Sequence, residues 1–94
     1  MGITVKSDRE LDYMREAGKV VAQAKALLAD ALRPGVTTLE LDCVADAEIS
    51  RLGATPSFKG YYGFPATICV SLNEQIVHGI PSDRVIQDGD IVSV

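Results

Sequence analysis

The first half of this chain predicts helices and the second half predicts strands and turns, with the border near Ala54. Ser7 and Glu10 have the spacing of a capping box, in which each side chain binds the backbone N–H of the other residue. Apolar residues then recur every three to four positions. This pattern predicts an amphipathic helix over residues 8–32, which Pro34 ends because proline disfavours a helical conformation in the residue before it.

A second capping box predicts another helix shortly after the first. Thr37 and Glu40 form this box, and Val36 and Leu41 have the spacing of a hydrophobic staple across it. Gly53 follows the last apolar position of this helix and fits a left-handed C-terminal cap.

Strands and tight turns are predicted after the helices. Residues 55–65 combine glycine and proline breaks with four of the five aromatic residues of the chain, namely Phe58, Tyr61, Tyr62 and Phe64. The elements expected beyond them are a strand from Thr67 to Leu72, a turn at Asn73-Glu74, a short extended piece at Ile76-Val77-His78, a turn over Gln87 to Asp90 and a final strand from Ile91 to Val94. Two helices followed by two or three strands predict an α+β fold in a single domain over residues 1–94.

The composition argues against several classes of partner. The net charge is -4 and the pI is about 4.7, with no cluster of Lys or Arg, so binding to nucleic acid through its phosphates is not expected. No apolar run approaches the ~18–20 residues that span a bilayer, and the N-terminus lacks the pattern of a signal peptide. Two cysteines are too few for a disulfide scaffold. The sequence therefore indicates a cytoplasmic protein without nucleic-acid or membrane partners.

The sequence offers no convincing metal site of its own. A catalytic zinc usually takes three protein ligands, and hard divalent ions need several carboxylates in fixed geometry. This chain has one histidine and two isolated cysteines. Its close acidic pair near a strand, Asp88 and Asp90, flanks Gly89 and is interpreted mainly as a turn.

A cysteine or serine nucleophile is less well supported than a structural role. Cys69 and Ser71 belong to the predicted strand that precedes His78, so the fold can bring either into contact with the imidazole. Neither residue lies in a glycine-flanked elbow or at a helix N-terminus. Cys69 and Cys43 are therefore predicted to be buried structural cysteines.

His78 and the aromatic segment each have a structural and a functional interpretation. His78 lies between an apolar pair and Gly79-Ile80-Pro81, so its backbone is expected to be held rigidly. Histidine can donate a hydrogen bond to a carbonyl or a developing oxyanion. The residue pattern alone nevertheless favours a structural role for His78. The aromatic segment fits equally well a hydrophobic patch under a loop or the wall of an apolar pocket.

Taken together, these segments resemble the N-terminal half of a type I methionine aminopeptidase. The resemblance covers essentially the whole chain and is carried by MREAGKVVA, RPGVTTLELD and above all GYYGFPATICVSLNEQIVHGIPSDRVIQDGDIVSV. It implies half of a pita-bread fold, with two N-terminal helices packed on a small, mainly antiparallel sheet. The family removes the initiator methionine of new proteins at a divalent-metal centre between two pseudo-symmetric halves.

The resemblance also assigns roles to particular residues. His78 matches the histidine that contacts the substrate near the scissile peptide and helps to stabilise the tetrahedral intermediate. Phe58, Tyr61, Phe64 and Cys69 match the positions that hold the methionine side chain, for which a soft apolar pocket is suitable. Several family members have cysteine or tyrosine where this chain has Phe58 and Phe64.

The metal ligands of the family are expected beyond this chain. The first metal-binding aspartate directly follows the segment that matches Ile91 to Val94, and the second aspartate, a histidine and two glutamates lie further on. The cobalt, manganese, iron or zinc of the parent protein would therefore have no ligands here, and the 94 residues alone are predicted to have no aminopeptidase activity.

Two alternatives remain from the sequence. One is a non-catalytic module of pita-bread type that binds peptides or partner proteins. The other is an engineered half-fold that associates with itself, because a lone half would expose apolar sheet surface and an unpaired strand edge. A C2 homodimer is the expected form of such an assembly, since the parent fold has pseudo-two-fold symmetry.

Overall fold

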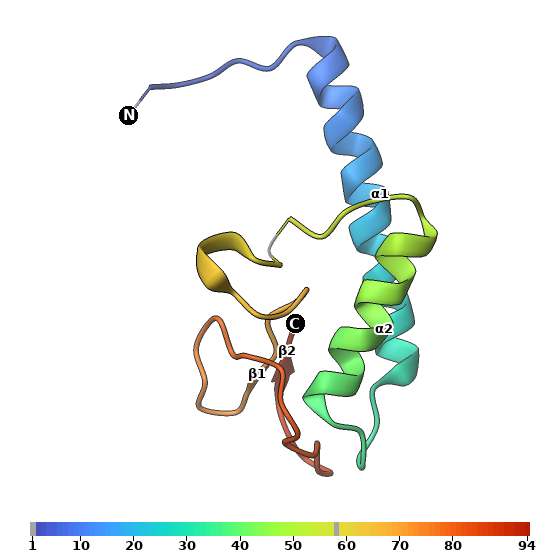
Figure 1. Cartoon of the computed structure of the whole chain (residues 1–94), viewed down its shortest axis with the longest axis vertical. Helices are drawn as coiled ribbons and strands as arrows, with labels where there is room; N and C mark the ends of the chain where they lie inside the picture. Colours follow the sequence, from blue (N-terminus) through green and yellow to red (C-terminus); the bar gives the residue numbers. More distant parts are fainter. Residues whose placement is uncertain (1, 58) are drawn as a thin grey trace.

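Two helices form one side of the molecule, and short strands joined by long loops form the other (Figure 1). The computed structural model describes residues 2–57 and 59–94. The helices α1 and α2 pack against each other. In chain order the elements are α1 (Asp8–Ala31), α2 (Thr38–Arg51), the 3-10 turn η1 (Tyr61–Gly63), β1 (Ser71–Leu72) and β2 (Val92–Ser93). The predicted α+β order is therefore confirmed.

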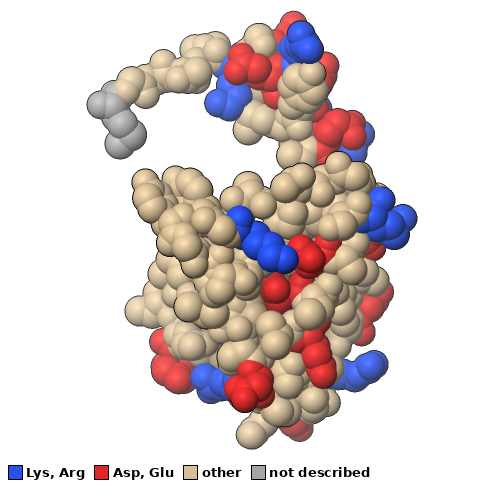
Figure 2. Space-filling view, in the orientation of Figure 1, with Lys and Arg blue, Asp and Glu red and all other residues tan. Residues whose placement is uncertain are grey.

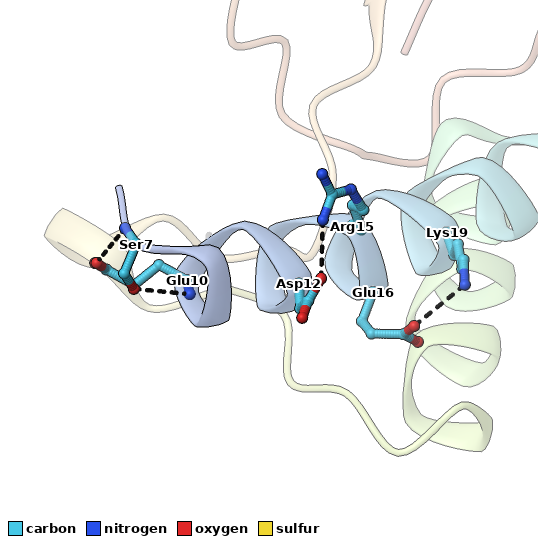
Figure 3. Close-up of polar contacts among 6 residues, drawn as sticks. All are labelled: Ser7, Glu10, Asp12, Arg15, Glu16 and Lys19. Atoms are coloured by element: carbon cyan, nitrogen blue, oxygen red, sulfur yellow. Dashed lines mark hydrogen bonds and ion pairs between the residues drawn. The ribbon is translucent and has the colours of Figure 1, made fainter. Parts of the chain in front are cut away.

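Helix α1 begins with the predicted capping box. The Ser7 N–H donates to Glu10 Oε1 at 3.0 Å, and the Glu10 N–H donates to Ser7 Oγ at 3.2 Å (Figure 3). Two ion pairs between residues three apart follow on the exposed face, and such pairs add little stability. Only Ala24 and Leu28 of this helix are buried, so its apolar stripe meets the core near its C-terminal end and is exposed before it.

Helix α2 also begins and ends as predicted. Thr37 and Glu40 form the second capping box, and Gly53 follows the helix with φ 78°. Leu41 and Ala45 turn inward from this helix and are fully buried. The hydrophobic core lies between the helices and the loop region and contains Leu28, Leu41, Ala45, Val70, Leu72 and Ile86.

The predicted strand from Thr67 to Leu72 is regular only at its end, as β1. Its first part is fixed by a side chain of α2 instead of a neighbouring strand. Asp42 Oδ1 accepts the N–H of Thr67 at 2.8 Å and that of Ile68 at 2.9 Å. Because a carboxylate has satisfied these two N–H groups, they cannot join a sheet ladder.

The other strand predictions need similar correction. Residues 76–78 do not form an extended piece, since His78 has a left-handed backbone with φ 56°. The final strand is confined to β2, which pairs antiparallel with β1 in the register Ser71 to Ser93 and Leu72 to Val92. The predicted turn before it is confirmed, because the Asp90 N–H donates to the Gln87 carbonyl at 3.1 Å.

Within the described residues, neither helix combines the length and the apolar character that crossing a membrane requires.

Candidate functional site

The aromatic segment and His78 line one open pocket of about 430 Å³. Gly60 and Gly63, both at positive φ, allow the chain to turn tightly around η1. The rings of Tyr61 and Tyr62 meet edge to face, with centroids 4.6 Å apart. The pocket is lined by Tyr61, Tyr62, Gly63, Phe64, Pro65, His78 and Ile80. Such a wall suits an apolar side chain.

Most of the pocket wall comes from a part of the chain without charged side chains. From Gly60 to Asn73 the sequence contains no Asp, Glu, Lys or Arg. Figure 2 shows the corresponding side of the molecule as a broad uncharged surface, with acidic and basic residues interspersed elsewhere. A neutral, aromatic-walled pocket favours an uncharged ligand group over a charged one.

His78 contacts the thiol of Cys69. Cys69 Sγ lies 3.6 Å from His78 Nδ1. Burial raises the pKa of the Cys69 thiol, so the sulfur keeps its proton at neutral pH. In the imidazole tautomer that is protonated on Nε2, the Cys69 S–H donates to Nδ1 and Nε2–H can act as a hydrogen-bond donor.

The structure brings three of the five predicted site residues into one pocket and separates a fourth from it. Tyr61, Phe64 and His78 share the pocket, whereas Cys69 reaches it only through His78. Cys69 itself lines an apolar groove of about 520 Å³ beside α1. Phe58, which the family resemblance also placed in the site, lies outside the described residues.

The prediction of buried cysteines is wrong for Cys43. This residue lies on the outer face of α2 and is exposed, while Cys69 is half-buried, and both are free thiols. Cys43 directly follows the buried Asp42, so the α-helical turn carries its side chain away from the core.

Sequence reasoning missed two residues that line the pocket. Ile80 and Pro65 contribute to its wall, although the sequence pattern around them does not indicate a pocket. The available signal was their position next to predicted site residues: Pro65 follows Phe64, and Ile80 lies two positions after His78.

Hydrogen bonds to α2 and β1 fix the loops that build the pocket. Thr67 Oγ1 donates to Asp46 Oδ1 at 2.8 Å, which adds to the two backbone bonds accepted by Asp42. On the other side, the Gly79 N–H donates to Ser71 Oγ at 3.1 Å. Both partners of this second bond are buried.

No metal-binding group is formed by the described part of the chain. Nowhere in residues 2–57 and 59–94 do three His, Cys, Asp or Glu side chains come together as possible ligands. Asp90, one of the two acidic residues considered from sequence, instead accepts hydrogen bonds from the Gln87 N–H at 2.9 Å and from Asn73 Nδ2 at 3.1 Å. These residues do not fit a divalent-metal centre.

The sequence profile of metallopeptidase family M24 matches residues 12–94. The chain therefore belongs to metallopeptidase family M24, whose members act with divalent metal ions.

Within this family the chain is similar to methionine aminopeptidases, as the sequence motifs predicted. It is 54% identical over 93 residues to the methionine aminopeptidase of Clostridium acetobutylicum and 53% identical over 92 residues to methionine aminopeptidase 1 of Bacillus subtilis. Each match covers 98% of this chain and 37% of the relative. The crystal structure of the methionine aminopeptidase of Rickettsia prowazekii superposes on this chain with a TM-score of 0.93 at 36% sequence identity, and that of the Thermotoga maritima enzyme with a TM-score of 0.94 at 37% identity. Each superposition covers 97% of this chain and 37% of the crystallised chain. The predicted pita-bread type of fold is thereby confirmed. The chain spans 37% of the length of these relatives.

Proposed function

We propose that this chain is the substrate-binding part of a methionine aminopeptidase that removes the initiator methionine of new proteins. The observation that carries the proposal is the uncharged pocket in which Tyr61, Phe64 and His78 lie together. The similarity to methionine aminopeptidases over nearly the whole chain supports it.

In this proposal the pocket binds the side chain of an N-terminal methionine. A thioether is apolar and polarisable and makes favourable contacts with aromatic rings, which Tyr61 and Phe64 offer. The family resemblance adds Phe58 and Cys69 to this set, and Cys69 contacts the pocket through His78. The absence of formal charge from Gly60 to Asn73 disfavours charged side chains at the same position.

His78 is proposed to act on the scissile peptide. With Nδ1 facing the Cys69 sulfur, Nε2–H can donate to the carbonyl oxygen of the first residue of the substrate. A donor aimed at an oxygen that gains negative charge stabilises the transition state more than the ground state. We infer that His78 contributes mainly to the rate of the reaction and the aromatic residues mainly to binding.

The divalent ion of the parent enzyme, whether cobalt, manganese, iron or zinc, would be held by residues that these 94 do not include. The 94 residues alone are proposed to be inactive for that reason. A cytoplasmic location is proposed as well, and the two free thiols support it because a reducing compartment keeps thiols unpaired.

A chimera tests the proposed function. This chain would replace the matching segment of the Bacillus subtilis relative, which is 53% identical to it over 92 residues. The purified, metal-supplemented chimera should release methionine from a Met-Ala peptide, and His78→Ala should reduce kcat by about 10²-fold or more. A folded chimera that binds the peptide without cleaving it would favour the non-catalytic binding module instead.

The isolated chain is further proposed to form a homodimer. Two apolar grooves, of about 230 and 520 Å³, both have Lys25, Leu28 and Val94 in their walls. Val21 and Val94 remain 54% and 50% exposed beside them. A second copy can cover this surface, since exposed apolar patches of this kind favour association. Sedimentation should show a dimer at tens of micromolar, and a well-folded monomer would contradict the proposal.

A further inference from the structure

We propose that Ser71 is a positioning residue that sets the backbone of His78 through Gly79. The inference rests on the proposed function of His78 and adds to it the element that orients the imidazole. Ser71 does not line the pocket, and it acts from β1 through one backbone hydrogen bond.

Two hydrogen bonds attach Gly79 to the first residue of β1 and to the residue before it. The Gly79 N–H donates to Ser71 Oγ at 3.1 Å, and the Gly79 carbonyl accepts the Val70 N–H at 2.9 Å. Ser71 is 4% exposed and Val70 is 2% exposed, so water does not compete for these groups. A buried N–H that loses its acceptor is costly, which makes the serine hydroxyl a specific requirement.

The approach between Gly79 and β1 is too close for any other residue. A Cβ atom at Gly79 would lie 2.1 Å from the Val70 carbonyl oxygen and 3.0 Å from the Ser71 Cα. Gly79 therefore allows the loop to lie directly on the strand. The serine hydroxyl then fixes the loop in that place.

His78 is the residue whose conformation depends on this attachment. Its φ of 56° is in the left-handed region, which is unfavourable for a non-glycine residue and persists only where the surroundings impose it. The attached Gly79 directly follows it and supplies that constraint. The imidazole is thereby directed to the pocket and to the sulfur of Cys69.

The first test uses the 94-residue chain. In Ser71→Ala the Gly79 amide should exchange with deuterium about tenfold faster, because its acceptor is gone. The strong NOE between the amide proton and Hα of His78, which a positive φ produces, should weaken. Ser71→Thr keeps the hydroxyl and should preserve both signals. Thr38→Val is the matched control, since Thr38 Oγ1 accepts the Ser82 N–H at 2.8 Å and its loss should leave Gly79 and His78 unchanged.

The second test uses the chimera with the Bacillus subtilis relative. Ser71→Ala should lower kcat about tenfold with little change in KM, because a small misplacement of a reacting group costs rate. In the His78→Ala background the same substitution should cause no further loss, as expected when Ser71 acts through His78.

The outcomes separate this proposal from the proposed function. Unchanged Gly79 exchange in Ser71→Ala, or losses of kcat that simply add in the double variant, would overturn the positioning role while leaving the activity intact. A folded chimera without activity would overturn the proposed function, and amide exchange and the His78 NOE would still decide whether Ser71 positions His78.

Discussion

The Asp42 carboxylate binds the backbone N–H of Thr67 at 2.8 Å and so joins the N-terminal half of α2 to the segment that leads into β1. The same oxygen accepts the Ile68 N–H at 2.9 Å. Asp42 is 7% exposed and Thr67 is 5% exposed. This buried carboxylate takes the place of a neighbouring strand and connects the helical half of the chain to the half that builds the pocket.

Replacing Asp42 by alanine should lower the free energy of unfolding by about 1–3 kcal/mol, because it leaves buried N–H groups without an acceptor. Asp42→Asn keeps one side-chain oxygen and should cost less. Asp12→Ala serves as the control, since it removes only an exposed pair with Arg15 and should change stability by less than about 1 kcal/mol. Urea unfolding measures all three variants, and equal effects of Asp42→Ala and Asp12→Ala would contradict the role of Asp42.

Two glycine substitutions should change stability in opposite directions. Gly79→Ala puts a Cβ 2.1 Å from the Val70 carbonyl oxygen and should destabilise the fold by about 1–3 kcal/mol. Gly18 lies within α1 with nothing within 4 Å of an added Cβ, so Gly18→Ala should stabilise by about 0.5–1 kcal/mol. Thermal unfolding gives the comparison. A Gly79→Ala variant as stable as the unsubstituted 94-residue chain would disprove the close approach of the loop at Gly79 to β1.

Asp90 should titrate below its ordinary pKa of 3.8, because the Gln87 N–H and then the Asn73 side chain donate to its charged form. Since the folded-state pKa is the lower one, the stabilisation of this turn is present above pH 3.8 and is lost as the pH falls through the folded-state value. Asn73→Gly keeps the positive φ of residue 73 accessible and removes one donor, so the Asp90 pKa should rise towards 3.8. NMR titration of the side-chain carboxyl would detect this. A pKa of Asp90 at or above 3.8 in the unsubstituted 94-residue chain would contradict this prediction.

The two thiols should react at different rates with iodoacetamide. Cys43 is exposed on α2, whereas Cys69 is half-buried and burial raises its pKa. At pH 8 Cys43 should be modified first, and the rate at Cys69 should keep rising above pH 9 as its thiolate forms. Peptide mass spectrometry resolves the two sites, and faster modification of Cys69 would contradict its burial.

The helices were predictable from sequence because their determinants are local. Each capping box involves residues three apart, and Gly53 acts on the last turn of its own helix. The strands were overestimated because Asp42 satisfies the N–H groups of Thr67 and Ile68 from 25 and 26 positions away. No local pattern reveals such a bond.

The candidate site could be predicted from the sequence only in part, because some of its determinants are also contacts between separate segments of the chain. The family motifs identified His78 and the aromatic residues, and the structure places Tyr61 and Phe64 with His78 in one pocket. The left-handed backbone of His78 and its attachment through Ser71 depend on a contact across eight residues, which strand alternation does not predict.

The most direct measurement compares methionine release from a Met-Ala peptide by the isolated chain and by the chimera, both purified and supplied with divalent metal. The 94 residues alone should release no methionine, whereas the chimera should release it clearly and should lose this activity when His78 is replaced by alanine. Release by the isolated chain, or none from a folded, metal-loaded chimera, would contradict the assignment of this chain as the substrate-binding part of a methionine aminopeptidase.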